Sequence, residues 1–154
     1  MTGDFFQLGY VTNDFDRGMA EIKALHGIGS FKEMRELHLP TGPDREAVAH
    51  FALAFRMGVQ FEVIAPLAGD VGIYRDLLSG HDFTLRFHHL GRFVGALEDY
   101  QDVLRKAQAR WRLPVSCGVF GGFYAYADAR GDLGHYLEFF TFPSAAFFAD
   151  VPRY

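Results

Sequence analysis

Residues 87–91 read FHHLG, and residues 5–9 read FFQLG, an arrangement with the same order of aromatic, polar, leucine and glycine positions. The two polar residues that correspond, Gln7 and His89, are 82 positions apart (89 − 7). Each stretch is apolar and rich in residues that favour strands, and each is followed by apolar residues at helical spacing. The repeat of a strand and a helix after the same polar residue predicts an internal duplication.

A second pair of stretches supports the duplication. Residues 61–64 (FEVI) resemble residues 137–140 (LEFF), and their glutamates, Glu62 and Glu138, are 76 positions apart (138 − 62). The two offsets differ by six residues, a difference that changes in loop length can absorb. Both halves of the chain therefore carry a polar residue in their first strand and another in their last strand.

Periodicity and turn signals predict the same order of elements in both halves. In the first half the predicted elements are a strand at 5–12, a helix from its cap at 13–14 to residue 26, a short strand at 30–39, a turn-rich loop at 40–46, and strands at 47–57 and 59–66. A short connecting helix is expected at 71–80. In the second half they are a strand at 83–94, a helix at 97–111, and strands at 115–120, 122–129 and 133–142 with a turn at 130–134.

Each half therefore reads βαβββ. The predicted fold class is α+β, in which tandem βαβββ modules form a sheet-lined cleft with the helices outside. We expect a single domain over residues 1–154, with modules at about 5–66 and 83–142 joined by the helix at 71–80. A C-terminal tail follows at 143–154, and it is apolar enough to pack on its own domain or across a dimer.

Composition narrows the function classes. The net charge of −4, from 15 basic and 19 acidic residues, gives no basic footprint for nucleic acid. The single cysteine, Cys117, excludes an internal disulfide and fits a reducing compartment. No apolar run approaches the length of a membrane span, and the start of the sequence lacks a basic signal-peptide region. We expect a cytoplasmic protein with a small-molecule partner, no nucleic acid and no membrane, and the 16% aromatic content favours an apolar ligand cavity.

Four polar residues interrupt otherwise apolar strands at corresponding places in the two halves, namely Gln7, Glu62, His89 and Glu138. Burying such groups costs free energy unless they find partners. If the halves are related by a twofold axis, the four side chains converge, and their nitrogen and oxygen donors suit one divalent metal ion (Zn, Ni, Co, Fe(II) or Mn). Taken singly, each has another interpretation: a solvated glutamate on an edge strand, a hydrogen-bonded core histidine, or a glutamine that faces solvent.

Strand alternation predicts which side chains line the cleft beside these four. Counting by twos places Phe87 with His89, and Tyr136 and Phe140 with Glu138, as substrate contacts. The same count adds Phe5, Gly9, Val11, Gln60, Ile64, Leu85 and Gly91 to the lining, and turns His88 to the opposite face. On the strand at 47–57, His50 and Arg56 share a possible cleft face, where Arg56 is the nearest candidate partner for an anionic group.

The segments QLGYVTND (7–14), FEVIAPLAG (61–69), HHLGRFV (88–94) and GHYLEFF (134–140), in this order, resemble the vicinal oxygen chelate superfamily of glyoxalase, bleomycin-resistance and extradiol dioxygenase proteins. The resemblance implies metal ligands at Gln7, Glu62, His89 and Glu138. Residues 62–80 followed by FHHLG are most similar to the methylmalonyl-CoA epimerase branch, although those epimerases usually have histidine at the first ligand position. Glyoxalase enzymes that use glutathione carry Arg and Asn where this chain has Val11 and Pro66, which argues against a glutathione adduct.

The resemblance implies a metal-binding, glyoxalase-like enzyme, an isomerase, epimerase or lyase, that transfers a proton next to a metal-chelated carbonyl of a small apolar or aromatic substrate. We expect Glu138 to act as the catalytic carboxylate, with Glu62 as the second choice. The alternative is a metal-free binding protein that sequesters an aromatic ligand in the manner of bleomycin-resistance proteins. A regulatory or structural member that keeps these residues by descent is a third interpretation, and a homodimer is expected from the family.

Overall fold

The computed structural model describes residues 4–143 and 148–154. Within these residues, eight strands and four helices follow one another in the order β1 (Asp4–Thr12), α1 (Phe15–His26), β2 (Lys32–Gly42), β3 (Arg45–Arg56), β4 (Val59–Gly69), α2 (Gly72–Arg75), β5 (Leu85–Phe93), α3 (Leu97–Gln108), β6 (Val115–Val119), β7 (Gly122–Ala127), α4 (Arg130–Leu133) and β8 (Tyr136–Thr141). Each half contains the predicted strand, helix and three further strands.

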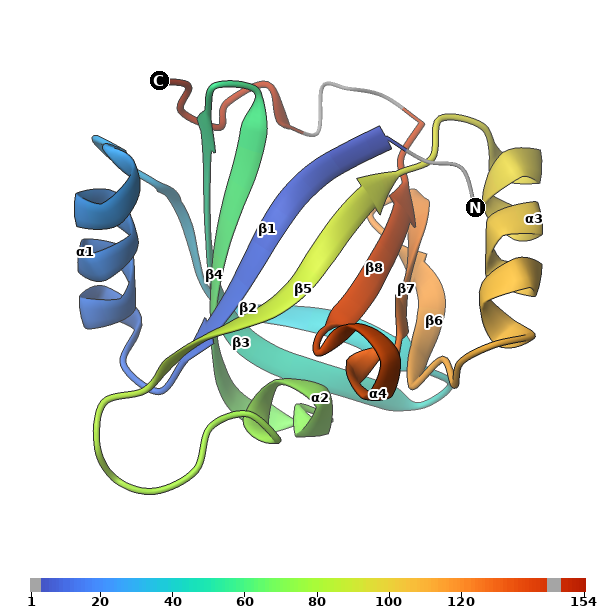
Figure 1. Ribbon diagram of the computed structural model, residues 1–154, viewed down its shortest axis with the longest axis horizontal. Helices are drawn as coiled ribbons and strands as arrows, with labels where there is room; N and C mark the ends of the chain where they lie inside the picture. Colours follow the sequence, from blue (N-terminus) through green and yellow to red (C-terminus); the bar gives the residue numbers. More distant parts are fainter. Residues whose placement is uncertain (1–3, 144–147) are drawn as a thin grey trace.

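The strands form one curved sheet in the order β2-β3-β4-β1-β5-β8-β7-β6 (Figure 1). The first strand of each half pairs in parallel with the last strand of the same half, β1 with β4 and β5 with β8. At the centre β1 and β5 pair in antiparallel orientation. This order is the same when read outward from the centre through either module, which confirms the predicted α+β fold of tandem βαβββ modules around a sheet-lined cleft.

The two long helices cover the outer face of the sheet, one on each module (Figure 1). Helix α1 buries Phe15, Met19 and Ile22 in a cluster with small residues of β3, such as Ala52 and Ala54. On the other module, α3 buries an equivalent row of residues against β7 and β8. The Asp14 side chain accepts a hydrogen bond from the Arg17 backbone N–H at the start of α1, as expected of a helix N-cap.

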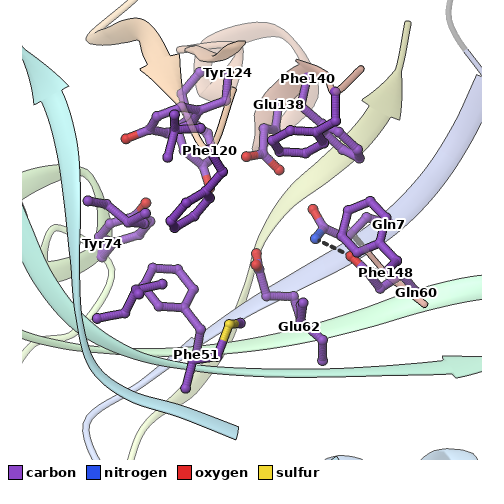
Figure 2. Close-up of a pocket in the computed structure, with 17 residues that line it drawn as sticks. Gln7, Phe51, Gln60, Glu62, Tyr74, Phe120, Tyr124, Glu138, Phe140 and Phe148 are labelled. Carbon is purple, nitrogen blue, oxygen red and sulfur yellow. Dashed lines mark hydrogen bonds between the residues drawn. The ribbon is translucent and has the colours of Figure 1, made fainter. Parts of the chain in front are cut away.

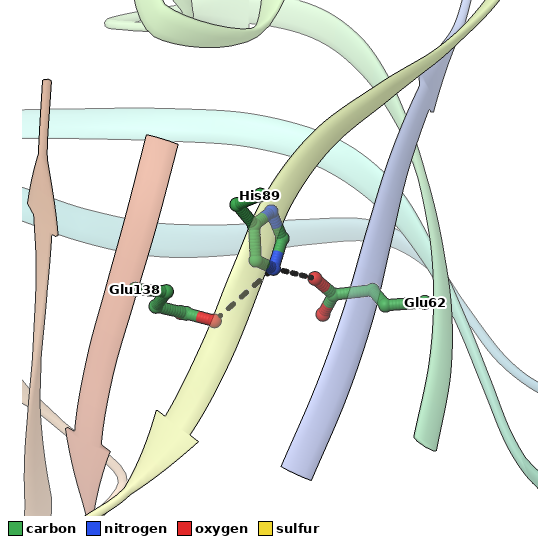
Figure 3. Close-up of side chains that lie close together, drawn as sticks. All are labelled: Glu62, His89 and Glu138. Atoms are coloured by element: carbon green, nitrogen blue, oxygen red, sulfur yellow. Dashed lines mark ion pairs between the residues drawn. The ribbon is translucent and has the colours of Figure 1, made fainter. Parts of the chain in front are cut away.

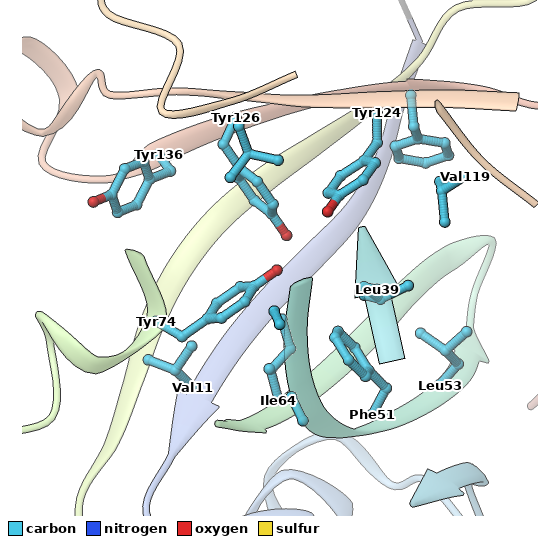
Figure 4. Close-up of a cluster of buried hydrophobic side chains, with 14 of the residues drawn as sticks. Val11, Leu39, Phe51, Leu53, Ile64, Tyr74, Val119, Tyr124, Tyr126 and Tyr136 are labelled. Atoms are coloured by element: carbon cyan, nitrogen blue, oxygen red, sulfur yellow. The ribbon is translucent and has the colours of Figure 1, made fainter. Parts of the chain in front are cut away.

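The concave face of the sheet encloses an aromatic core (Figure 4). Here the two outermost strands, β2 and β6, approach each other and nearly close the sheet into a barrel. The carbonyl oxygen of Pro40 on β2 accepts the hydroxyl of Tyr124 at 2.6 Å and the thiol of Cys117 at 3.0 Å. Side chains therefore make the hydrogen bonds at this closure.

The loop predicted at 40–46 is wrong, because the actual connection is shorter. Strand β2 continues to Gly42, where it pairs with Arg45, so the connection to β3 contains only residues 43 and 44. Asp44 takes a positive φ of 54°, and the Thr41 hydroxyl donates a hydrogen bond to the Asp70 carboxylate at 2.6 Å. Two further elements differ from the prediction. The connecting helix is shorter than expected and covers only Gly72–Arg75. The predicted turn at 130–134 contains the one-turn helix α4.

The C-terminal segment packs along its own chain. Residues 144–147 of the expected tail lie outside the described residues, but Phe148 and Val151 are buried in the core of the concave face. The Phe55 N–H donates to the Pro152 carbonyl and the Tyr154 N–H donates to the Phe55 carbonyl, so the segment extends the hydrogen bonding at the end of β3. Among the described helices, none has the length and apolar character needed to cross a membrane.

Candidate metal centre and ligand cavity

The four central strands each carry one of the predicted polar side chains to the concave face. Glu62 lies on β4, Gln7 on β1, His89 on β5 and Glu138 on β8, and at most 9% of any of them is exposed. The register explains why they meet. Gly9 pairs with both Glu62 and His89, and in the same way Gly91 pairs with both Glu138 and Gln7.

The side chains converge on one nitrogen atom. His89 Nε2 lies 3.3 Å from Glu62 Oε2 and 3.2 Å from Glu138 Oε2 (Figure 3). Gln7 Oε1 lies 2.9 Å from the same nitrogen. The potential ligand atoms of Glu62, His89 and Glu138 all lie within 4.8 Å of one another. Glu62 Oε2 is held only by the ion pair with His89 and has no hydrogen bond of good geometry among the described residues. Two carboxylates, an imidazole and an oxygen in need of a partner fit a divalent cation.

Gln7 is held with its carbonyl oxygen toward this centre. Its amide nitrogen donates to Gln60 Oε1 at 2.7 Å, which leaves Gln7 Oε1 directed at His89. Gln7 can therefore offer a fourth donor atom, an oxygen, to a metal ion. The Gln60 amide nitrogen has no partner among the described groups and borders the same cavity.

His88 fixes the orientation of the His89 ring. His88 Nε2 lies 2.9 Å from the carbonyl oxygen of Ile73, which can only accept, so this nitrogen carries a hydrogen. Burial, together with the charges of His89 and Arg130, holds the pKa of His88 well below its usual value, so the ring is neutral. His88 Nδ1 therefore accepts the hydrogen of His89 Nδ1 at 2.9 Å. This contact leaves His89 Nε2 facing the carboxylates, the tautomer that a metal ion requires.

The electrostatics of the centre favour positive charge between the two carboxylates. Burial raises the pKa of Glu62. Burial lowers the pKa of His89, but the close contacts with the Glu138 and Glu62 carboxylates outweigh burial and raise this pKa to about 9. Without a metal, a protonated imidazole therefore supplies the positive charge. A divalent ion that replaced this proton would balance the two carboxylates in full.

The centre forms one end of an apolar cavity (Figure 2). Its polar lining consists of Gln7, Gln60, Glu62, Glu138 and the tyrosine side chains. The remaining lining is aliphatic or aromatic and comes from both modules: Met34, Leu37, Leu39, Phe51, Leu53, Val119, Phe120, Phe140, Phe142 and Phe148. Such an enclosure with a few convergent polar groups is typical of a small-molecule site.

Two β-bulges overturn part of the lining expected from strand alternation. Phe6 is an unpaired extra residue on β1, because Phe5 and Gln7 pair with consecutive residues of β5. His88 is the corresponding extra residue on β5, 82 positions later (88 − 6). Each bulge shifts the alternation by one residue. As a result Phe5 and Phe87 are 46% and 37% exposed, whereas His88, expected on the opposite face, is buried against Tyr136 and His89.

Of the substrate contacts expected on β3 and β8, only Phe140 lies in the cavity lining. Phe140 lines the cavity, and Tyr136 is buried against His88 behind the metal centre rather than in the cavity lining. His50 faces helix α1, where its ring contacts Phe15 and its Nδ1 accepts the Glu36 N–H at 2.9 Å. Arg56 is on this same face of β3 and lies close to Gly27 at the end of α1. The cavity-facing residues of β3 are Phe51 and Leu53, so the predicted face of this strand is wrong.

Sequence reasoning missed Tyr74, Tyr124 and Tyr126, which also line the cavity. Tyr74 lies at the C-terminal end of the connecting segment α2, and no strand periodicity applies there. Tyr124 and Tyr126 alternate along β7 and face inward, a pattern that strand alternation could have revealed.

No profile of a known protein family matches this chain, and no curated protein sequence is similar to it. Solved structures do share its architecture. A variant of Streptomyces coelicolor methylmalonyl-CoA epimerase in complex with 2-nitronate-propionyl-CoA superposes with a TM-score of 0.59 at 12% identity, covering 94% of this chain and 100% of the other. The epimerase from Mycobacterium tuberculosis gives 0.56 at 16% identity, covering 96% and 92%. A hypothetical protein from Bacillus halodurans C-125 gives 0.59 at 15% identity, covering 92% and 95%.

This chain has the vicinal oxygen chelate fold. At these identities the likeness concerns the fold, so the chemistry of the centre rests on the chain's own residues. Glu62, His89 and Glu138 lie on the central strands β4, β5 and β8, at the centre of the cleft. Their donor atoms could hold a divalent metal.

Proposed function

We propose that this protein is a metal-dependent enzyme of the vicinal oxygen chelate type, an isomerase, epimerase or lyase that moves a proton on a carbon next to a carbonyl group. Its substrate is small and apolar or aromatic rather than a glutathione adduct. The observation that carries the proposal is the convergence of Glu62, His89 and Glu138 at the end of an enclosed apolar cavity. The epimerase neighbours are consistent with this reaction class.

In the proposal, Gln7, Glu62, His89 and Glu138 hold one divalent ion (Zn, Ni, Co, Fe(II) or Mn). Bound there, the ion supplies Lewis acidity that makes a carbon-bound proton beside a substrate carbonyl easier to remove. His88 keeps the His89 ring in place through the hydrogen bond between their Nδ1 atoms.

Two carboxylates are available to move the proton, and they approach from opposite modules. Glu138 extends from β8 and Glu62 from β4, with His89 between them (Figure 3). We assign the proton transfer to a carboxylate oxygen of Glu138, with Glu62 as the partner on the opposite face of the substrate. Burial raises the pKa of Glu62, which suits a group that holds a proton during part of the reaction. One carboxylate on each side of a substrate carbon is the arrangement that an epimerisation requires.

The cavity walls supply orientation and exclude water. Aromatic residues of both modules, among them Phe51, Tyr124 and Phe140, enclose the space beside the carboxylates. Excluding water strengthens the electrostatic interactions inside and limits side reactions. The positions of Val11 and Pro66, where glutathione-dependent relatives of the superfamily carry Arg and Asn, support a substrate other than a glutathione adduct.

The first experiment is metal analysis of the purified full chain by mass spectrometry. We expect about one divalent ion per chain in the wild type and loss of the ion in Glu138→Ala, with Glu46→Ala, an exposed carboxylate on β3, as the matched control. The metal-loaded protein is then incubated in D₂O with hydroxyketones, 2-oxo acids and acyl-CoA esters. Exchange of a hydrogen next to the carbonyl, lost in Glu138→Gln, is the expected NMR result.

The competing function is a metal-free protein that sequesters an aromatic ligand. The aromatic cavity fits this role as well, since its walls need no metal to hold an apolar ring. A wild-type protein that takes up no metal on dialysis but binds an aromatic ligand would favour sequestration and contradict the enzyme. We also propose that the protein is cytoplasmic and that it forms a homodimer. Light scattering at micromolar concentration tests the homodimer.

A further inference from the structure

Gln60 carries a buried hydrogen-bond donor that has no partner. The residue is fully buried on β4 and lines the cavity, and its amide nitrogen, Nε2, makes no hydrogen bond within residues 4–143 and 148–154. Leaving a buried donor unpaired costs free energy. Because this nitrogen has two hydrogens to donate, it is a candidate contact for an acceptor atom of a ligand.

The orientation of the Gln60 amide follows from the metal centre. Gln7 directs its carbonyl oxygen at His89 and donates from its amide nitrogen to Gln60 at 2.7 Å (Figure 2). An amide nitrogen can only donate, so the Gln60 atom that it meets is the carbonyl oxygen, Oε1. A reversed Gln60 amide would place two donors against each other. The acceptor of Gln60 is therefore used by Gln7, and both hydrogens on its nitrogen are left over.

The carboxylates nearest to Gln60 along the chain and across the cavity are held by the centre. Glu62 lies two residues further along β4, so its side chain and that of Gln60 face the same side of the sheet. Glu62 and Glu138 nevertheless direct their Oε2 atoms at His89 Nε2, at 3.3 and 3.2 Å, and neither accepts from Gln60.

The apolar walls offer no acceptor either. Phe140 and Phe148 belong to the same lining and carry only hydrocarbon side chains. An acceptor for Gln60 therefore has to come from a molecule inside the cavity. Gln7 connects the Gln60 amide to His89, so the metal centre and this donor form two polar points on adjacent central strands, in surroundings that are otherwise largely apolar.

We propose that Gln60 is a specificity-determining residue, whose amide donates a hydrogen bond to a second oxygen of the ligand, apart from the oxygen at the metal centre. The ligand class that follows is an aromatic or branched apolar compound with two oxygen groups, the second of them a carbonyl or carboxylate oxygen. The proposal rests on the proposed function only for the oxygen at the metal, because the donor is present in an enzyme and in a sequestering protein alike.

The test compares neutral ligands of the same shape with and without the second oxygen. The first pair is para-diacetylbenzene and para-isopropylacetophenone, and the two meta isomers form the second. Each pair shares one acetyl group and differs by an acetyl or an isopropyl group at the other end. Calorimetry on the full chain, metal-free and loaded with Zn²⁺, measures the dissociation constants. We expect the tighter diketone to bind about fivefold more tightly than its isopropyl analogue. Equal constants within both pairs overturn the proposal, and so does a panel in which neither diketone binds.

A variant checks that Gln60 is the cause. Gln60→Met removes the donor and keeps the length of the side chain, and we expect it to bring the two dissociation constants of a pair to about the same value. Gln101→Met, at an exposed position on α3, is the control and should keep the wild-type ratio. If Gln60 only holds Gln7 in place, the variant weakens both members of a pair equally. A wild-type ratio in Gln60→Met therefore overturns the proposal.

A second measurement needs no variant. The chain has five side-chain amide groups, those of Asn13 and four glutamines, so nitrogen-15 NMR can resolve the Gln60 amide and assign it through its backbone. We expect the bound diketone to shift the Gln60 amide protons downfield and its isopropyl analogue to leave them nearly unchanged. A bound diketone that does not shift these signals contradicts the contact.

The outcome can be separated from that of the proposed function. A protein that prefers the diketones through Gln60 but holds no metal and exchanges no hydrogen supports the donor site and refutes the enzyme. A protein that holds metal and exchanges hydrogen, with equal constants within each pair, supports the enzyme and refutes the donor site.

Discussion

Gly9 and His89 face each other across β1 and β5, and the imidazole ring occupies the space that a side chain at position 9 would need. A Cβ atom built on Gly9 would lie 1.9 Å from His89 Cε1. The second module repeats this relationship in reverse, since a Cβ on Gly91 would lie 2.7 Å from Gln7 Oε1. Each module therefore leaves room on its first strand for the donor side chain of the other.

Gly9→Ala is expected to displace the His89 ring and to destabilise the protein by about 1–3 kcal/mol, the usual cost of overpacking a core. The ring is held by His88 and by two carboxylates, so it cannot move without losing hydrogen bonds. Urea denaturation and metal titration measure the two effects. Gly131→Ala is the control, because a Cβ there meets no neighbour within 4 Å. A Gly9→Ala protein with wild-type stability and metal affinity would show that the ring is not confined.

His88→Phe is expected to weaken metal binding by about 10–100-fold, the range observed when the hydrogen-bond partner of a ligating histidine is lost. Phenylalanine can keep the stacking on Tyr136 but cannot accept the hydrogen of His89 Nδ1. Competition with a chelating dye measures the affinity, and thermal unfolding verifies the fold. Tyr74→Phe, which alters another neighbour of the His88 ring, should keep wild-type affinity. Equal affinities for His88→Phe and wild type would remove His88 from the metal centre.

The metal-free protein is expected to lose stability as the pH rises from about 6.5 through 9. The pKa of His89 is raised to about 9 in the folded state, so the folded protein binds a proton there that the unfolded chain releases near pH 6.5. A group of this kind stabilises fully below its unfolded pKa, and the contribution disappears above the folded one. Burial also raises the pKa of Glu62, so the stability that this group contributes is likewise lost as the pH rises.

Unfolding in the presence of a chelator, at intervals between pH 6 and 10, measures this decline. The double variant Glu62→Gln, Glu138→Gln removes both carboxylates that raise the pKa of His89, and its stability should not decline across this interval. A metal-free wild type whose stability is constant or rises from pH 6.5 to 9 would contradict the protonated imidazole.

Phe148→Ala is expected to cost about 3 kcal/mol, the lower end for truncating a buried phenylalanine, because one wall of the cavity already adjoins the residue. Phe148 packs on Phe6, Phe55 and Phe140, which ties the C-terminal segment to both modules. Phe123→Ala, at a position that is 41% exposed, is the control and should change stability far less. Chemical denaturation compares the two, and equal costs would contradict the packing role of the segment.

The duplication and the convergence of four polar residues could be predicted from the sequence, and the strand register gives the physical reason. The offsets of 82 and 76 residues reappear as equivalent pairings, Gly9 with Glu62 and Gly91 with Glu138. A polar residue in an apolar strand needs a partner, and a repeated polar position implies that the repeats supply partners to each other.

The orientation of some strands could not be predicted. The bulges at Phe6 and His88 leave no glycine or proline at the extra residue, so counting by twos continued through them and assigned Phe5 and Phe87 to the wrong face. Strand β3 is covered on both faces, by α1 outside and by the cavity inside, so residues 51–55 are apolar without interruption. Alternation then carries little information, and His50 was assigned to the wrong face.

The contact between β2 and β6, which closes the sheet, is held by a different type of interaction from the contacts between the other neighbouring strands. Within residues 4–143 and 148–154, neighbouring strands elsewhere share a ladder of backbone hydrogen bonds, whereas here the Pro40 carbonyl accepts two side-chain hydrogen bonds. The edges of the two modules can therefore separate along this line by giving up a hydroxyl, a thiol and apolar contacts, with every backbone ladder intact.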